Sequence, residues 1–279
     1  MKPRRPLLAL ALLIASPCAD AQTIYFADGR SVPLSEAKIS GTTIALPLKL
    51  KEGGASGEIR LPISSVARVD WPAPPELTEA ESRLIAGEAG EALVGIDAVL
   101  PVHEPFKDVP GSWWHRATIV RLEAFARLGR RVDAEVELER LRRSKSGTTL
   151  VPRGIVAIAA SLAETGKAGE ARDLLTLVDR DSASDALKAR LALVDGRIYA
   201  ASGDTEAALL AFLRVPVLFP TQREPQSAAL LEAILCYRAM NEPARADALR
   251  VRLLRLYPDS PEVKRLRAQE TSAAFHHDT

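Results

Sequence analysis

Cysteine is nearly absent from this chain, with two in 279 residues, and this scarcity excludes a fold held together by several disulfides. The sequence also lacks a glycine-rich phosphate loop, the ligand spacing of a zinc site and the strand-to-helix turn that carries a catalytic serine. Aromatic residues make up only 5% of the chain. We therefore expect a protein that is not an enzyme, with no catalytic residues, no cofactor and no bound metal.

An excess of charge of one sign is also missing. The 37 basic residues nearly cancel the 36 acidic ones, so no bulk attraction to nucleic acid is expected. The one long apolar run, Leu7–Ala15, is too short to cross a bilayer, and we expect no transmembrane segment. A hydrophobic content of 47% with few aromatics is typical of helices rich in alanine and leucine.

Residues 1–21 have the pattern of a secretory signal peptide. Basic residues at the start precede Leu7–Ala15, and Ala19-Asp20-Ala21 is a small-residue cleavage site. Cleavage after Ala21 would leave a mature chain that begins at Gln22. The sequence therefore predicts a periplasmic or secreted protein.

Two other interpretations of this segment stay open. The Arg4-Arg5 pair resembles a twin-arginine signal without its usual surroundings, and Cys18 is a candidate for a lipid anchor although Pro17 precedes it. If Cys18 is removed with the signal, Cys236 is the one cysteine left. Its apolar neighbours favour a small buried residue over a reactive thiol.

Residues 22–71 contain short alternating runs separated by turns at Asp28-Gly29 and Ser40-Gly41. Four or five strands of this length predict a small all-β module, either a curled sheet or an SH3-like barrel. The prolines of residues 72–75 then predict a stiff linker.

A recurrence dominates the rest of the chain. A turn residue is followed five positions later by alanine, and the turn residues lie 42, 37, 37 and 38 positions apart. The five pairs are Gly87/Ala92, Gly129/Ala134, Gly166/Ala171, Gly203/Ala208 and Asn241/Ala246. A period of this size indicates stacked helical hairpins, in which a left-handed turn ends one helix and the alanine lets the next approach closely.

At Gly203…Ala208…Pro220 and Asn241…Ala246…Pro258 the chain resembles the tetratricopeptide repeat family. The resemblance implies a mostly α fold, with five hairpins over residues 76–259 forming a right-handed solenoid after the β module. Ser260-Pro261-Glu262 predicts a capping helix that ends near Gln269, and we expect a disordered tail after Thr271. The Leu-Tyr-Pro-Asp-Ser ending is similar to that of periplasmic members of the family.

Three arginines occupy equivalent places, each thirteen residues before its turn glycine: Arg116, Arg153 and Arg190. The resemblance implies that such positions face the concave groove, where Arg127, Arg197 and Arg238 would join them. Guanidinium groups bind carboxylates in two-pronged fashion, so an acidic or C-terminal peptide is a candidate ligand. The alternative is a solvated or internally paired set, with Glu123 as one partner.

The adjacent Trp113 and Trp114 are the other partner-binding candidates, because tryptophan is favoured at interface hot spots. Alternatively they fill the groove between the first two hairpins. Neighbouring side chains point about 100° apart on a helix, so one buried and one part-exposed ring is expected.

Two functional hypotheses follow. In the first, the protein is a periplasmic scaffold that binds a protein or peptide partner, possibly acidic, through its concave surface. In the second, it is a structural subunit of a cell-envelope assembly, and the β module is the targeting element. A basic groove favours the first hypothesis, and a large exposed apolar patch elsewhere favours the second.

The signal-peptide interpretation predicts the N-terminus of the exported product. We expect mass spectrometry of the secreted chain to show a first residue of Gln22. A lipid-modified terminus at Cys18 would show anchoring instead, and an intact Met1 would contradict export by either route.

Overall fold

The computed structural model describes residues 22–48, 57–145 and 147–277, and the chain divides into two compact units. The first unit holds the described residues up to Pro72 together with Val109–Ser112. The second holds Ala73–Asp108 and the chain from Trp113 onward. The predicted signal peptide, with Cys18, lies outside the described residues.

The first unit contains two small antiparallel sheets. Strand order is β2-β1-β6 in one and β3-β4-β5 in the other. The strands are β1 (Thr23–Phe26), β2 (Ser31–Pro33), β3 (Lys38–Ser40), β4 (Thr43–Leu48), β5 (Gly57–Pro62) and β6 (Val66–Asp70). The small antiparallel β region expected from the sequence is therefore present.

Alternation explains the central strand β1. Ile24 and Phe26 are buried, while the residues between them face partly outward, because successive side chains on a strand point to opposite faces. The edge strand β2 has only three residues and ends at Pro33, which is why the sequence pattern did not reveal it. The separate segment Val109–Ser112 is joined to this unit by a backbone hydrogen bond, which Val69 donates to the carbonyl of Pro110 at 2.9 Å.

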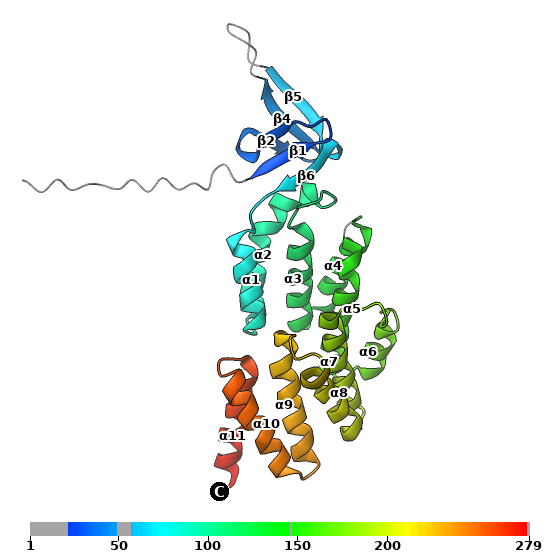
Figure 1. Cartoon of the computed structure of the whole chain (residues 1–279), viewed down its shortest axis with the longest axis vertical. Helices are drawn as coiled ribbons and strands as arrows, with labels where there is room; N and C mark the ends of the chain where they lie inside the picture. The colour runs from blue at the N-terminus through cyan, green and yellow to red at the C-terminus, as the bar shows by residue number, and fades with distance from the viewer. Residues whose placement is uncertain (1–21, 49–56, 146, 278–279) are drawn as a thin grey trace, which may run out of the picture. The chain divides into compact units, whose positions relative to one another are not determined.

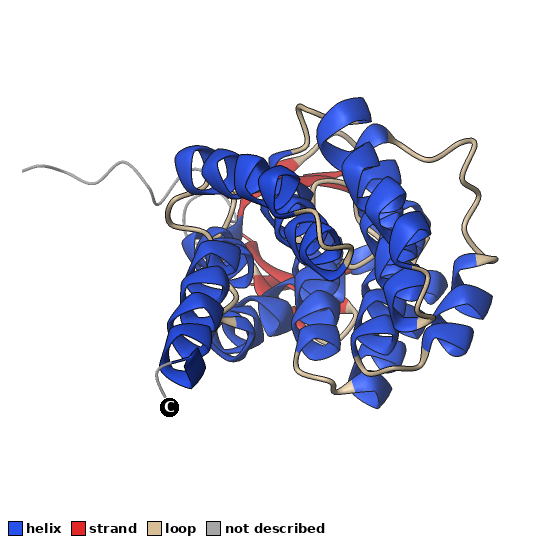
Figure 2. Cartoon of the chain, turned by 90° about the horizontal axis from the view of Figure 1, so that it is seen from below, coloured by secondary structure: helices blue, strands red, loops and turns tan. Residues whose placement is uncertain are grey.

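The regular structure of the second unit is helical in its described part (Figures 1 and 2). Five helix pairs follow one another, and an eleventh helix comes last. The pairs are α1 (Pro75–Ile85) with α2 (Ala89–His103), α3 (Trp114–Arg127) with α4 (Arg131–Arg143), α5 (Val151–Glu164) with α6 (Ala168–Leu175), α7 (Asp185–Ala201) with α8 (Thr205–Leu218), and α9 (Arg223–Ala239) with α10 (Pro243–Leu256).

The turn between the two helices of each pair has the conformation that the sequence predicts. All five turn residues have positive φ, from 58° at Asn241 to 85° at Gly87. In each pair the residue after the turn donates its N–H to the carbonyl five positions earlier, as Glu88 does to Arg83 at 2.9 Å. The five alanines that follow are at most 1% exposed. Each therefore lies where its helix packs closely.

Packing between pairs follows a regular pattern. The first helix of each pair packs on its own second helix and also on the first helix of the next pair, from α1 through α9. One hydrophobic cluster runs continuously from Leu77 in α1 to Ile198 in α7, and a further cluster joins α9 and α10 to α11. No pair buries its apolar residues alone.

The last helix, α11, runs over Pro261–His277, so the expected end near Gln269 and the disordered tail after Thr271 are wrong. Its start agrees with the sequence, since the Ser260 hydroxyl accepts the N–H of Val263 at 3.3 Å. Pro261 also lies against the first turn of the unit. A Cβ atom added to Gly87 would stand 3.5 Å from Cγ of Pro261, which is ordinary van der Waals contact.

Close packing inside a pair is tested by Gly196→Ala. A Cβ at Gly196 in α7 would lie 2.4 Å from the ring of Phe212 in α8. We expect a loss of about 1–3 kcal/mol in the free energy of unfolding, because the ring has to move.

Gly169→Ala is the matched control for this substitution. Gly169 lies in α6 with open space around it, and alanine there should raise stability by about 0.5–1 kcal/mol. Urea unfolding of the two variants checks both signs. Equal stability of Gly196→Ala and the unmodified chain would contradict the close contact.

Candidate partner-binding hollow

A hollow in the second unit has a volume of ≈ 1060 Å³. Its wall is formed by the first helices of all five pairs and by the start of α11. Beyond these helices, only the turn after α1, the last residue of α10 and the loop that follows α10 contribute. The regular packing of first helices on one another thus creates one continuous concave wall.

Small side chains make the floor of this hollow wide. The residues of this kind in its lining are Ser82, Ala86, Gly87, Ala126, Ala157, Ala160, Ser161, Ser227, Ala228 and Ser260. Charged residues are balanced, with five arginines (127, 190, 197, 223 and 265) against five acidic residues (123, 164, 224, 259 and 262). The lining of the hollow therefore carries no excess of positive charge.

A buried carboxylate organises one side of the wall. Glu123 of α3 is only 3% exposed. Its carboxylate accepts hydrogen bonds from Nε and Nη2 of Arg153, at 2.6 and 2.8 Å, and from Nη1 of Arg190, at 2.8 Å. Burial alone would raise the pKa of Glu123, but the guanidinium groups of Arg190 and Arg153 outweigh it and hold that pKa below its ordinary value. Glu123 is therefore charged in the folded protein.

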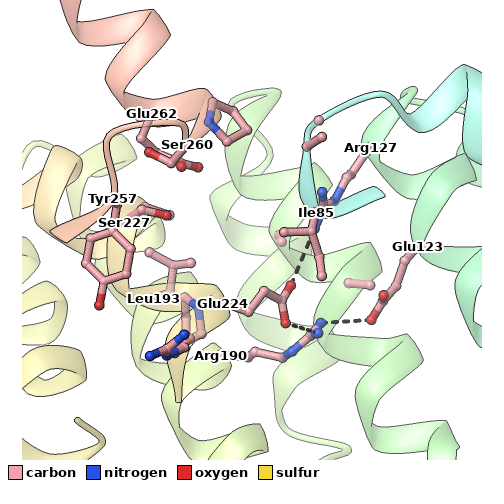
Figure 3. Close-up of a pocket in the computed structure, with 18 of the residues that line it drawn as sticks. Ile85, Glu123, Arg127, Arg190, Leu193, Glu224, Ser227, Tyr257, Ser260 and Glu262 are labelled. Atoms are coloured by element: carbon pink, nitrogen blue, oxygen red, sulfur yellow. Dashed lines mark hydrogen bonds and ion pairs between the residues drawn. The ribbon is translucent and has the colours of Figure 1, made fainter. Parts of the chain in front are cut away.

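A second carboxylate lies between two helices that are distant in sequence. Glu224, in the first turn of α9, contacts Arg190 of α7 and lies 3.5 Å from Nη2 of Arg127 in α3. Figure 3 shows Glu224 between the two arginines, with Arg190 also bonded to Glu123. Arg127 donates as well to the carbonyl of Leu84, at the end of α1. The sequence analysis did not identify Glu224.

The six predicted arginines do not form a free basic stripe, and Arg127 lies beside Glu224. Arg153 and Arg190 meet at Glu123. The others pair separately: Nη2 of Arg116 with Glu81 at 2.6 Å, Nη1 of Arg197 with Glu164 at 2.5 Å, and Nη2 of Arg238 with Glu270 at 2.8 Å. Arg190, Arg197 and Arg127 line the hollow, whereas Arg116, Arg153 and Arg238 are not among its lining residues. The internally paired interpretation, with Glu123 as a partner, describes this geometry.

The two tryptophans lie outside the lining of the hollow. Trp114 is fully buried, and its Nε1 donates to Glu104 at 2.6 Å. Trp113 is part-exposed, with the guanidinium of Arg116 5.6 Å from its ring centre. One ring is buried and its neighbour half-buried, as expected, although Trp113 precedes α3 and is not part of the helix.

The arrangement most like a catalytic one is a serine, a histidine and an aspartate that the sequence analysis did not connect. The hydroxyl of Ser144 lies 2.8 Å from Nε2 of His115 and 3.1 Å from Asp108. Asp108 also accepts the N–H of Lys145, so it holds the chain after α4. Ser144 is buried, and burial lowers the pKa of His115. These contacts fasten the end of α4 to the loop between α2 and α3, and the Ser144 side chain is buried.

The thiol of Cys236 is also a buried group of the core. Burial raises the pKa of the Cys236 thiol to about 11, which agrees with a small apolar residue in the core. The residues that the structure describes contain no group of three or more metal-ligating side chains. Among the same residues no helix is both long enough and apolar enough to cross a membrane.

Comparison of the chain with models of known protein families gives no match, and comparison with curated proteins gives none either.

Glu123 can be tested by removing its charge without changing its shape. Glu123→Gln leaves Arg153 and Arg190 beside a neutral group in a buried site, and we expect a loss of about 3–5 kcal/mol in unfolding free energy. Chemical denaturation at pH 7 measures this loss.

Glu139→Gln is the control for Glu123→Gln. Glu139 forms ion pairs with Arg142 and Arg143 on the surface of α4, where such pairs contribute little, and its loss should cost less than about 0.5 kcal/mol. Similar losses in the two variants would show that burial of Glu123 is unimportant.

Proposed function

We propose that this chain is a non-enzymatic, periplasmic scaffold of the tetratricopeptide type, which binds an extended segment of a protein partner in the hollow. The observation that carries the proposal is the wall itself, to which the first helix of every pair contributes. The regular contacts between successive pairs support a solenoid, and the left-handed turns with their buried alanines support the family resemblance.

The dimensions favour an extended segment over a folded domain. A hollow of ≈ 1060 Å³ lies at the upper end of the usual size of ligand pockets, about 300–1,000 Å³, which suits a short extended segment and is too small for a folded domain. The small floor residues leave the backbone of such a segment room to approach. The positive and negative charges of the wall balance, so the bound segment need not be acidic along its whole length. The hypothesis of an acidic peptide is therefore reduced to a segment with individual carboxylates.

A row of apolar side chains favours the second candidate, a structural subunit of an envelope assembly. Val94, Val136 and Leu210 each stand seven residues after a turn residue, and they are 74%, 53% and 64% exposed. Repeated exposure of large apolar residues at one position suits contact with other subunits. In this case the helix pairs would pack on neighbours through their second helices.

Two variants of the mature protein distinguish the candidates. Ala160→Trp places a large ring in the hollow, where Ala160 is part-exposed. The triple variant Val94→Ser, Val136→Ser, Leu210→Ser changes the outer row only. The arginines are less suitable, because two of them neutralise the buried Glu123.

If the scaffold proposal is right, Ala160→Trp should retain at least tenfold less partner from envelope extract, measured by quantitative mass spectrometry, and the triple variant should retain the normal amount. Circular dichroism confirms that both variants fold. Loss of partner in the triple variant alone would favour the structural subunit, and full retention by Ala160→Trp would contradict binding in the hollow.

A further inference from the structure

The ion pairs of the repeated arginines follow a register. Arg116 pairs with Glu81 and Arg153 with Glu123, and in both cases the carboxylate stands six residues before the turn of the preceding pair. For Arg190 the corresponding position is Ala160, which has no carboxylate. Arg190 therefore shares Glu123 with Arg153, and takes its second contact from Glu224.

Glu224 differs from Glu123 in its surroundings. Its side chain is 33% exposed, against 4% for the side chain of Glu123, and it lies in the hollow at the start of α9. Its carboxylate reaches Arg190 and Arg127, which come from α7 and α3. Glu224 is therefore a part-exposed carboxylate of the hollow that lies between two arginines from other helices (Figure 3).

We infer that Arg190 and Arg127 form a carboxylate subsite, which Glu224 occupies in the free protein and which a carboxylate of the bound segment takes over. The inference rests on the proposed function, since the segment has to lie in the hollow. The exchange replaces one carboxylate by another, so the net charge at the two guanidinium groups stays the same. Arg153 keeps its bonds to Glu123 throughout, so the buried pair is not disturbed.

The geometry favours a carboxylate because two guanidinium groups from different helices converge on one acid group. Guanidinium binds carboxylate through parallel N–H donors, more strongly than it binds a neutral acceptor. Displacement of Glu224 also limits affinity, because the ligand competes with a group already in place. Glu224 therefore selects for segments that bring a carboxylate together with other contacts.

The subsite is tested by emptying it with Glu224→Ala and offering small carboxylates. At pH 7 and constant ionic strength, 100 mM sodium acetate should raise the melting temperature of this variant by about 2–4 °C relative to 100 mM sodium chloride. The unmodified protein should show no such difference, because Glu224 fills the place. Glu224→Ser, which also empties the place, serves if the alanine variant does not fold.

Glu81→Ala is the matched control. It also removes the carboxylate partner of a repeated arginine, but Arg116 is half-exposed and is not part of the lining of the hollow. We expect no acetate-specific rise there. Equal effects of acetate and chloride on Glu224→Ala, or an equal acetate effect on Glu81→Ala, would overturn the inference.

Two further probes distinguish the possible sources of the carboxylate. Propionate represents an acidic side chain, and N-acetylalanine represents the end of a peptide. A larger rise in the melting temperature of Glu224→Ala with one of them identifies the source, and a rise with neither overturns the inference.

Failure of the subsite and failure of the proposed function have different signatures. An acetate effect on Glu224→Ala without partner loss in Ala160→Trp would contradict the scaffold and leave the subsite. Partner loss in Ala160→Trp without an acetate effect on Glu224→Ala would support the scaffold and contradict the subsite.

Discussion

The close approach of two helices beside a left-handed turn is the constraint on which the helical unit depends. Glycine or asparagine reverses the chain, and a fully buried alanine five residues later allows the returning helix to pack against the first. Because this geometry recurs, the first helices of successive pairs also pack on one another. The concave wall and the alignment of Arg116, Arg153 and Arg190 are consequences of that repetition.

Electrostatics in the wall are governed by the same repetition. Arg116 and Arg153 each reach back to a carboxylate of the preceding pair, so these two repeated positive charges are neutralised within the wall of helices. A repeated basic position is thus not by itself a binding surface. Function is to be sought where the register is broken, and it is broken at Ala160, which leaves Arg190 to share one acid and borrow another.

Much of the fold could be predicted from local sequence. The turn residues and their alanines gave the pair boundaries, because left-handed φ and close packing restrict the residue type strongly. Helix α11 was expected to be shorter, since its polar residues beyond Gln269 lack an apolar period. The site was harder to predict. Glu81 and Glu123 stand in register with the arginines and could have been paired by alignment, whereas Glu224 is out of register and only the folded chain brings it to Arg127.

Pro261 lies so near Gly87 that an added Cβ would be in van der Waals contact with its ring, and this brings the two ends of the helical unit together. In an open row of helix pairs the outermost pair has one neighbour and opens first. Here the first pair has a second neighbour from a residue 174 positions later in the chain. The first pair to be synthesised therefore gains this neighbour only when α11 is made. Such a long-range contact raises contact order, and with it the time the chain needs to fold.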